Sequence, residues 1–360
     1  MKLIFDMDAV VYPAASIAEE RFITTTHTLT GIVREFENRT AFYGDWRKKV
    51  GGFIGLQNEL SGDEYYKAED FTVVDEQRLR PFRVKGFGDE PDTFLSPLDG
   101  AKKYVNDKIR SVCNTLKTES YIGFTGTGRV FRHDVARLLE YKGNRNATAR
   151  PLLLSELKGW VCEAHNTTMI TGFEADDAVS AATVQGYKNW VANGRQDEDV
   201  VINISAEKDS WQVEGHHYHL VKGGPVTLIE GLGSLWLNEK GDVVGNGRMW
   251  LYMQCSSEDN SDHYAANSFS DIKWGPKSAY KALKDCATDK QAFESMVGIF
   301  KKLYPEPKTV EGCKGSVDID WLFVFQECMD MAFMCRHLNS PRDRVVIKDV
   351  LDKMGISYAD

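Results

Sequence analysis

Short apolar segments alternate with stretches of helical pattern over the first two thirds of this sequence, and that alternation limits the possible folds more than any other feature. The clearest short segments are Lys2–Asp6, Ser120–Thr125 and Asp199–Ser205. Helical patterns over residues 97–116 and 152–164, and a helix opened by acids near Glu174, stand between them. Strands that alternate with helices form parallel sheets covered by helices, so we expect an α/β fold.

The remaining segments predict how the chain is organised. A first helix is expected over residues 14–35, followed by a polar, turn-rich insertion over residues 36–98. Strands and turns are expected from residue 216 to residue 250, and helices from residue 251 to residue 360. We therefore predict a core over residues 1–250 and a helical region over residues 251–360.

The composition excludes several classes of protein. Apolar residues are 42% and charged residues 27% of the 360 residues, close to the average for globular proteins, which excludes a disordered, collagen-like or disulfide-scaffold chain. The apolar runs are too short for a membrane span. The seven cysteines lack the close spacing of a zinc or redox site, and two acids interrupt the apolar start MKLIFDMDAVVY, which argues against a secretory signal. We expect reduced thiols and a cytoplasmic location.

The net charge of −9 rules out a basic footprint over the whole chain. A nucleic-acid partner then requires local basic patches, or acids that bound cations neutralise. Residues 129–158 form one such patch, with seven Lys or Arg against three Asp or Glu. A second group, Lys273, Lys277 and Lys281, has the spacing of one helix stripe. Taken alone, the first patch is better explained as a solvated surface than as a nucleic-acid contact. The second group is explained equally well as a solvated lysine face or as a nucleic-acid contact.

Acidic residues stand at the ends of predicted strands or in the turns beyond them, where open parallel sheets place their sites. The groups are Asp6; Glu174, Asp176 and Asp177; Glu207 and Asp209; and Asp259 and Asp262. Glu207 and Asp209 are two apart, so they point to the same side of an extended chain. Glu174 and Asp177 are three apart and share a helix face.

Each acidic group has an ordinary explanation when taken alone. Acids that open a helix usually cap it, and capping is the better explanation for Asp176 and Asp177 by themselves. Carboxylates gathered at one sheet edge repel each other, and burying them is costly unless a cation neutralises them. Oxygen ligands suit Mg²⁺ or Mn²⁺, and a pair of such ions hydrolyses phosphodiester bonds. The acids together therefore predict a two-metal site.

The motifs, taken in order, carry a family resemblance over residues 1 to about 285. They are Asp6 after the first strand, FRHD at 131–134, YKGNR at 141–145, EADD at 174–177, AEKD at 206–209, the acids of DNSD at 259–262, and WGPKSA at 274–279. The sequence resembles the 5′-nucleases of the flap-endonuclease superfamily. Within that superfamily it is most similar to bacteriophage 5′→3′ exonucleases, and also to the 5′-nuclease domain of bacterial DNA polymerase I.

This resemblance implies a three-layer, PIN-like nuclease core with a C-terminal helix–hairpin–helix region that binds DNA and often a K⁺ ion. It implies an arch over residues 132–155 and two bound ions, Mg²⁺ or Mn²⁺. The implied metal ligands are Asp6, Glu174, Asp176, Asp177, Glu207, Asp209, Asp259 and Asp262. The implied catalytic residues are Lys142, Arg145 and Asp177. The implied DNA contacts are Arg132, Lys142, Arg145, Arg150, Lys273, Gly275, Lys277, Ser278 and Lys281.

The expected activity is that of a 5′→3′ exonuclease or flap endonuclease on DNA, with 5′ ends, flaps and nicked duplexes as substrates. A role in phage DNA replication or host DNA degradation follows from the same resemblance. RNA primers in RNA–DNA hybrids are a further expected substrate, and a monomer is expected. For residues 36–98, contact with a replication protein is one hypothesis.

The sequence departs from the family pattern at four places. The second strand usually carries an acid near Thr125 and Gly126, and FTGTGRVF has none. Glu207 replaces an Asp, Glu258 replaces a Gly, and residues 260–269 lack the usual N-x-P-G turn. A missing ligand is compatible with Mg²⁺, which often keeps several water ligands.

Two other functions fit part of the sequence. The start LIFDMDAVV resembles the DxDG motif of haloacid-dehalogenase phosphatases, with Asp6 as nucleophile and Asp8 as acid, although Ala9 stands where Gly is usual. A DNA-binding protein on an inactive nuclease scaffold is the other alternative, suggested by the missing acid of the second strand. His216, His217 and His219 could suggest zinc, but surface histidines explain them better because no fourth ligand lies nearby.

Overall fold

A computed structural model describes residues 1–45, 51–61, 66–145, 149–339 and 342–358. The chain divides into two compact units. Unit 1 contains residues 1–10, 109–149 and 158–360, and unit 2 contains residues 11–108 and 150–157. The expected boundary near residue 250 does not coincide with this division.

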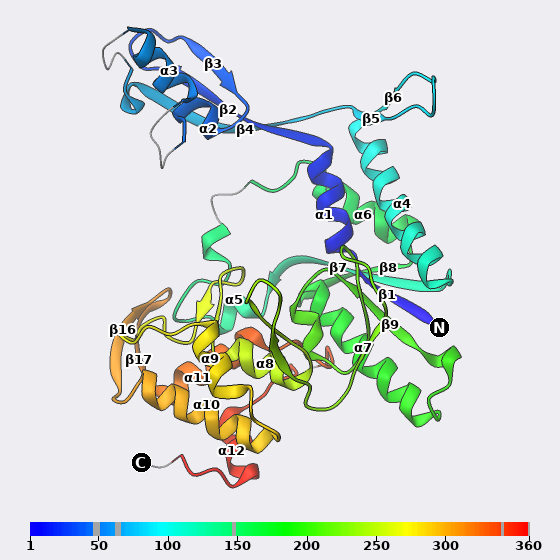
Figure 1. Cartoon of the computed structure of the whole chain (residues 1–360), viewed down its shortest axis with the longest axis vertical. Helices are drawn as coiled ribbons and strands as arrows, with labels where there is room; N and C mark the ends of the chain where they lie inside the picture. The colour runs from blue at the N-terminus through cyan, green and yellow to red at the C-terminus, as the bar shows by residue number, and fades with distance from the viewer. Residues whose placement is uncertain (46–50, 62–65, 146–148, 340–341, 359–360) are drawn as a thin grey trace. The chain divides into compact units, whose positions relative to one another are not determined.

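Unit 1 is built on a mostly parallel sheet (Figure 1). Its strands are β1 (Lys2–Asp6), β7 (Tyr121–Val130), β8 (Thr167–Gly172), β9 (Val201–Ser205), β10 (Gly215–His219) and β11 (Thr227–Ile229). They lie in the order β11-β10-β9-β1-β7-β8, and every neighbouring pair is parallel except β10 and β11. The predicted α/β class is confirmed.

Strand β1 lies in the middle of the sheet because its side chains are apolar on both faces. Leu3, Ile4 and Phe5 are all buried, as expected for a parallel strand covered from both sides. Helix α7 (Ala175–Ala192) lies on one side of the strands, and the ends of α4 (Pro97–Leu116) and α6 (Leu154–Ala164) that belong to unit 1 lie on the other (Figure 1). This arrangement gives the three expected layers.

The second strand is longer than the sequence predicts. Strand β7 does not end at Thr125 but runs through the glycines to Val130, with an irregularity in its pairing to β8 between Thr127 and Val130. Glycine weakens a strand and often marks a bulge, so the sequence signal at Gly126 and Gly128 pointed to a loop. Pairing with β8 extends the strand through these glycines.

The C-terminal part of unit 1 is mainly helical, with short hairpins between helices. The helices are α8 (Gly247–Cys255), α9 (Pro276–Leu283), α10 (Asp289–Leu303), α11 (Trp321–Ala332) and α12 (Ile347–Met354). The hairpins pair β12 (Leu235–Leu237) with β13 (Val243–Gly245), β14 (Glu258–Asp259) with β15 (Tyr264–Ala265), and β16 (Lys308–Gly312) with β17 (Gly315–Ile319). The prediction of helices from residue 251 to the end is therefore correct only in part.

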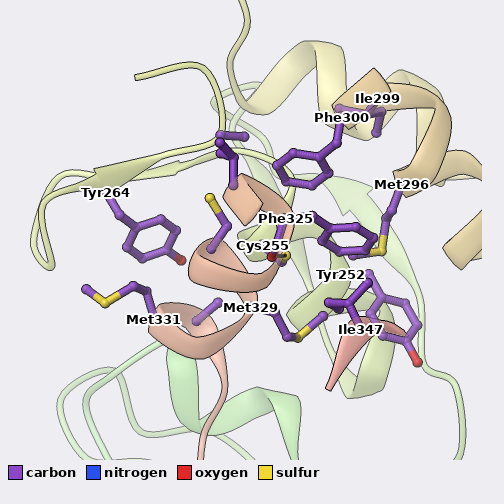
Figure 2. Packing of buried hydrophobic residues seen from close by; sticks show 14 of the residues in the cluster. Tyr252, Cys255, Tyr264, Met296, Ile299, Phe300, Phe325, Met329, Met331 and Ile347 are labelled. Atoms are coloured by element: carbon purple, nitrogen blue, oxygen red, sulfur yellow. Dashed lines mark hydrogen bonds between the residues drawn. The ribbon is translucent and has the colours of Figure 1, made fainter. Parts of the chain in front are cut away.

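One apolar core holds these helices together. The rings of Phe300 and Phe325 stack with centroids 4.6 Å apart, surrounded by buried methionines and Cys255 (Figure 2). Val130, the last residue of β7, and Tyr141, which follows that strand, belong to the same core. The helical region and the residues after β7 are therefore parts of one folded body.

No helix among the described residues is long and apolar enough to cross a membrane.

Unit 2 contains the rest of α1 (Asp8–Ile17) and a small antiparallel sheet of β2 (Glu19–His27), β3 (Val33–Phe36) and β4 (Phe71–Leu79). The predicted helix over residues 14–35 is wrong after Ile17. The run Ile23–Thr26 is β-branched and pairs with β4 along its whole length, and β-branched residues favour strands.

The expected insertion has its own structure. It contains α2 (Arg39–Tyr43), α3 (Gly52–Ser61), a 3₁₀ turn (Ala68–Asp70), β5 (Phe82–Val84) and β6 (Thr93–Leu95). Its small core is mostly aromatic, with Phe36, Phe42, Phe53, Tyr66 and Phe71 packed together with Ile23, Ile54 and Val73. Residues 46–50 and 62–65 of this insertion lie outside the described part of the chain.

Candidate metal centre and nucleic-acid interface

The acids from three strand ends meet at the carboxyl edge of the central sheet. Asp6 is the last residue of β1, Glu174 follows β8, and Glu207 follows β9. Asp6 is 4% exposed, and its Oδ1 accepts the N–H groups of Asp8 at 3.0 Å and Ala9 at 3.4 Å. Asp6 therefore also caps the start of α1.

Burial and repulsion raise the pKa values of two of these carboxyls. The pKa of Asp6 rises to about 7, first because the group is buried and then because Asp8 and Glu207 repel its charge. The pKa of Asp176 is raised well above its usual value by burial, Glu174 and Asp177. A cation that binds between such buried, mutually repelling carboxyls stabilises their ionised form.

Asp176 is the residue whose environment best fits a metal ion. Its Oδ1 is buried and has no hydrogen-bond partner among the described residues. One oxygen each from Glu174, Asp176 and Asp177 lie within 4.8 Å of one another. Buried oxygens without partners are rare and costly, and a divalent cation with oxygen ligands satisfies such a group. The donor set at this edge therefore suits Mg²⁺ or Mn²⁺.

Glu174 is held by three donors. It accepts from Lys142 Nζ at 2.5 Å, Tyr141 Oη at 2.5 Å and Arg132 Nη1 at 3.0 Å. Burial alone raises its pKa, but the charges of Arg132 and Lys142 outweigh burial and lower the pKa below the usual value. Glu174 is therefore ionised and oriented before any cation binds.

Asp177 has a structural role in addition to the one that the motif implies. It is fully buried, and its oxygens accept from Arg132 Nη1 at 2.7 Å and Nη2 at 3.0 Å, from the N–H of Glu174 at 3.2 Å and from the N–H of Cys335 at 3.1 Å. The carboxylate caps α7 and neutralises Arg132. These contacts use both oxygens, while Asp177 also lies in one group with Glu174 and Asp176, so its role as a metal ligand stays a prediction.

The expected DNA contact of Arg132 is wrong. Its side chain is 1% exposed. Besides Asp177, it donates to the carbonyl oxygens of Met331 at 3.1 Å and Phe333 at 2.9 Å. The guanidinium is therefore an internal connection between α7 and the end of α11, and it has no free donor that faces a phosphate.

The second acidic group has a geometry that the spacing did not predict. Glu207 and Asp209 do not lie on an extended chain, because Lys208 has helical dihedral angles and Asp209 begins a 3₁₀ turn (Asp209–Gln212). Lys208 Nζ contacts Asp209 at 2.9 Å and also donates to Asp259. A lysine thus occupies the space between two predicted ligands.

Asp259 is the last residue of β14, and Asp262 lies in the turn that follows it. Asp259 Oδ1 accepts the N–H groups of Ser261 at 2.7 Å and Asp262 at 3.1 Å. Burial raises the pKa of Asp259, but Lys208 outweighs it and the pKa is lowered. For Asp262, burial raises the pKa to about 6, with Lys142 acting against it and Glu174 adding to it.

Lys142 connects the acids of α7 with those of the turn after β14. Its Nζ lies 2.5 Å from Glu174 Oε1 and 3.6 Å from Asp262 Oδ1, and its backbone N–H donates to the Asp262 carbonyl at 3.2 Å. Its φ is 55°, which is uncommon for a residue other than glycine. Such strain concentrates at functional sites.

Arg145 and the expected arch are only partly described. Arg145 is exposed at the end of a 3₁₀ turn (Gly143–Arg145). Residues 146–148 of the expected arch lie outside the described residues, and residues 150–155 belong to unit 2. Arg150 is exposed in unit 2, so its contact with DNA stays a prediction, as does the arch.

Of the second basic group, Lys277 and Lys281 lie on α9 as the spacing predicts, whereas Lys273 precedes the helix, so the expected stripe of three lysines is wrong for Lys273. Gly275 is the N-cap of α9, and Ser278 stands in its first turn. Lys273, Lys277 and Lys281 are exposed, and within the described part of the chain no ion pair holds them. An open hollow at this end is lined by residues 241–243 and 275–278.

The site contains residues that the sequence analysis did not assign to a nuclease. Asp8 opens α1, and its carboxylate contacts Lys158 and Thr125, which lies within β7. The signal was present in the sequence as an acid two residues after Asp6.

The expectation of surface histidines is also wrong for His217, which is 2% exposed on β10.

The comparisons with known proteins find distant structural similarities. No protein-family model and no curated protein matches this sequence. Among solved structures, the chain is similar to the D15 protein of bacteriophage T5 crystallised with metal ions, at 15% identity and a TM-score of 0.35. The chain is also similar to a Lys-to-Ala mutant of the T5 5′-exonuclease, at 14% identity and a TM-score of 0.33.

A third solved structure is an Asp-to-Lys variant of the bacteriophage T5 flap endonuclease, in a pseudo-enzyme–product complex with DNA and metal ions, at 17% identity and a TM-score of 0.36. Each similarity covers 65% of this chain and 78% of the other chain. At such values the similarity does not indicate a function by itself, so the function has to be argued from the residues.

Proposed function

We propose that this chain is a nuclease that uses divalent cations to hydrolyse DNA phosphodiester bonds from 5′ ends, as a 5′→3′ exonuclease or flap endonuclease. The observation that carries the proposal is the buried, unpartnered Oδ1 of Asp176, within a group of acids brought together from three strand ends. A structural cluster of acids would satisfy such an oxygen internally.

The proposed ligands fall into two groups. Asp6, Glu174 and Asp176 form the first group, at the ends of β1 and β8. Glu207, Asp209, Asp259 and Asp262 form the second, where Lys208 and Lys142 supply positive charge in the metal-free chain. Mg²⁺ or Mn²⁺ ions bound at these acids supply Lewis-acid chemistry for phosphodiester hydrolysis.

Lys142 and Arg145 are the proposed phosphate contacts. Lys142 rests on Glu174 and Asp262 in the metal-free chain. When cations neutralise these acids, its ammonium becomes free to approach a phosphate oxygen and to stabilise the charge that develops there. Arg145 is exposed nearby in sequence and can hold a phosphate with two parallel hydrogen bonds.

Helix α9 is the proposed contact with duplex DNA. Its N-terminal N–H groups at Gly275 to Ser278 suit a backbone phosphate. Lys273, Lys277 and Lys281 add cations on the same segment. Binding of K⁺ at this turn, cleavage of RNA primers, a monomeric state and a role in phage replication or host DNA degradation remain predictions of the same proposal.

The test compares substrates at fixed metal concentration. With Mn²⁺ or Mg²⁺ the purified chain should release short products from 5′-labelled duplex and 5′-flap DNA, and EDTA should stop the reaction. Covalently closed circles and p-nitrophenyl phosphate should stay intact. DNA that is bound but never cut would support the inactive DNA-binding alternative, whereas cleavage of the phosphomonoester would support the phosphatase alternative.

A further inference from the structure

Strand β7 carries no acid at the level where β1 ends, beside Phe124, which pairs with Asp6. Thr125 is fully buried there, and Gly126 follows it. A Cβ placed on Gly126 would lie 3.5 Å from Asp8 Oδ2 and 3.3 Å from the N atom of Ala175, the first residue of α7. The carboxylate of Asp8 therefore lies beside the position where a side chain of β7 would begin.

Three donors from unit 1 fix the carboxylate of Asp8 at this place. Thr125 Oγ1 donates to Oδ1 at 2.5 Å, the N–H of Gly126 donates to Oδ2 at 3.3 Å, and Lys158 Nζ lies 2.8 Å from Oδ1. Lys158 also donates to the carbonyl of Gly126 at 2.5 Å. Asp8 is thus attached to the backbone of the strand that has no acid of its own.

The contacts leave Asp8 accessible on one side. Its side chain is 35% exposed, and within the described residues Oδ2 accepts one hydrogen bond, the long one from the N–H of Gly126. The unpartnered Oδ1 of Asp176, two residues after Glu174 at the start of α7, is the independent sign that a cation belongs at this edge.

We propose that Asp8, carried by α1, supplies the carboxylate that β7 lacks and so completes the acidic group that holds a divalent cation at this edge of the sheet. Lys158 is then a positioning residue, which holds Asp8 against Gly126 and balances its charge while no cation is bound. The proposal rests on the proposed function, because it concerns the same metal centre.

The experiment measures Mn²⁺ binding without DNA, by isothermal titration calorimetry on the full chain. Asp8→Asn keeps an oxygen for Thr125 but removes the charge, and we expect it to weaken Mn²⁺ binding at least tenfold or to remove one binding event. Asp318→Asn is the matched control, because Asp318 also accepts from a threonine hydroxyl at 2.5 Å but lies on the exposed β17. Its Mn²⁺ binding should equal that of the wild type.

A transplanted carboxylate tests the geometry. The double variant Asp8→Ala with Gly126→Asp moves the acid from α1 to β7, into the space that Asp8 vacates, and it should bind Mn²⁺ within about threefold of the wild type. Lys158→Met leaves every carboxylate in place and removes only the ammonium that opposes the cation. It should bind Mn²⁺ about threefold more tightly, which keeps the proposal testable if Asp8→Asn does not fold.

The outcomes separate this inference from the proposed function. If the wild type binds Mn²⁺ and cuts DNA while Asp8→Asn binds Mn²⁺ equally well, the inference fails and the proposed function stands. Unchanged binding by Lys158→Met would also count against the inference. If the wild type binds no Mn²⁺ and cuts no DNA, the proposed function fails and the inference fails with it.

Discussion

Arg132 and Asp177 form a buried ion pair in which Nη1 and Nη2 donate to both carboxylate oxygens, at 2.7 and 3.0 Å. The two side chains are 1% and 0% exposed. The pair joins the start of α7 to the carbonyl oxygens of Met331 and Phe333 after α11. It therefore holds the end of the helical region against the helix that carries Glu174 and Asp176.

Removing one partner of this pair should destabilise the fold rather than change DNA affinity. Arg132→Ala leaves Asp177 buried and unpaired, and we expect a loss of about 3–5 kcal/mol in the free energy of unfolding. Urea denaturation in EDTA measures it. The double variant Arg132→Met with Asp177→Leu should recover much of the loss. Normal stability with weakened DNA binding would instead return Arg132 to the DNA interface.

Asp176→Asn should stop cleavage while the metal-free protein becomes more stable. The substitution removes a carboxyl whose pKa is raised first by burial and then by Glu174 and Asp177, so we expect a gain of about 1 kcal/mol, roughly a 2 °C rise in melting temperature. Asp209→Asn should also stop cleavage, but with less effect on stability because Lys208 already contacts Asp209. Differential scanning calorimetry in EDTA and a 5′-labelled duplex assay check both. Cleavage within tenfold of wild type for both variants would refute the two-metal proposal.

Lys142→Ala should lower turnover more than it lowers DNA affinity. The ammonium acts on charge that develops as the phosphate reacts, so we expect kcat to fall about 100-fold and Kd to change less than threefold. Single-turnover cleavage and equilibrium binding in Ca²⁺ measure the two quantities. Lys142→Arg, which keeps the charge, should recover part of the rate. Equal losses in rate and affinity would make Lys142 a simple binding residue.

Replacement of both Lys277 and Lys281 with Ala should weaken duplex binding and reduce its salt dependence. Each phosphate contact contributes about one unit to the slope of log affinity against log salt, so the slope should fall by up to about two units. Lys188→Ala, an exposed lysine on α7, is the control and should leave the slope unchanged. Fluorescence anisotropy at several salt concentrations provides the slopes. An unchanged slope in the double variant would place the duplex elsewhere.

His217 should make the metal-free protein less stable below neutral pH. Burial lowers its pKa to about 4, with a hydrogen bond to the Val213 carbonyl acting against this and His216 adding to it. The unfolded chain has a pKa near 6.5, so between pH 6.5 and pH 4 only the unfolded state binds the proton. Stability should fall by up to about 3 kcal/mol across this window as the pH decreases.

Urea unfolding of the wild type and His217→Gln at pH 7.5, 5.5 and 4.5 isolates this contribution. The difference between the two proteins should change with pH in the stated direction. The Nδ1 atom of His217 is buried without a partner among the described residues, so protonation there gains no new acceptor. If the free energies of unfolding of the two proteins changed with pH in parallel, His217 would be charged in the folded state.

Local patterns in the sequence determined the elements whose formation depends on neighbouring residues. The alternation of strands and helices predicted the parallel sheet, and α4 has the predicted bounds Pro97–Leu116. Acids after β1, β8 and β9 meet at one edge because parallel strands end on the same side. These features follow from periodicity and strand direction, which the sequence contains within short windows.

Only the tertiary structure decided which polar groups are already satisfied. Asp177 and Arg132 belong to motifs that implied metal and DNA, yet each is occupied by the other and by residues some 150 to 200 positions away. The strand Ile23–Thr26 replaced an expected helix because β4 pairs with it. Asp8 is held against β7 by contacts with Thr125, Gly126 and Lys158. Such pairings join distant parts of the chain, and no local window of sequence contains both partners.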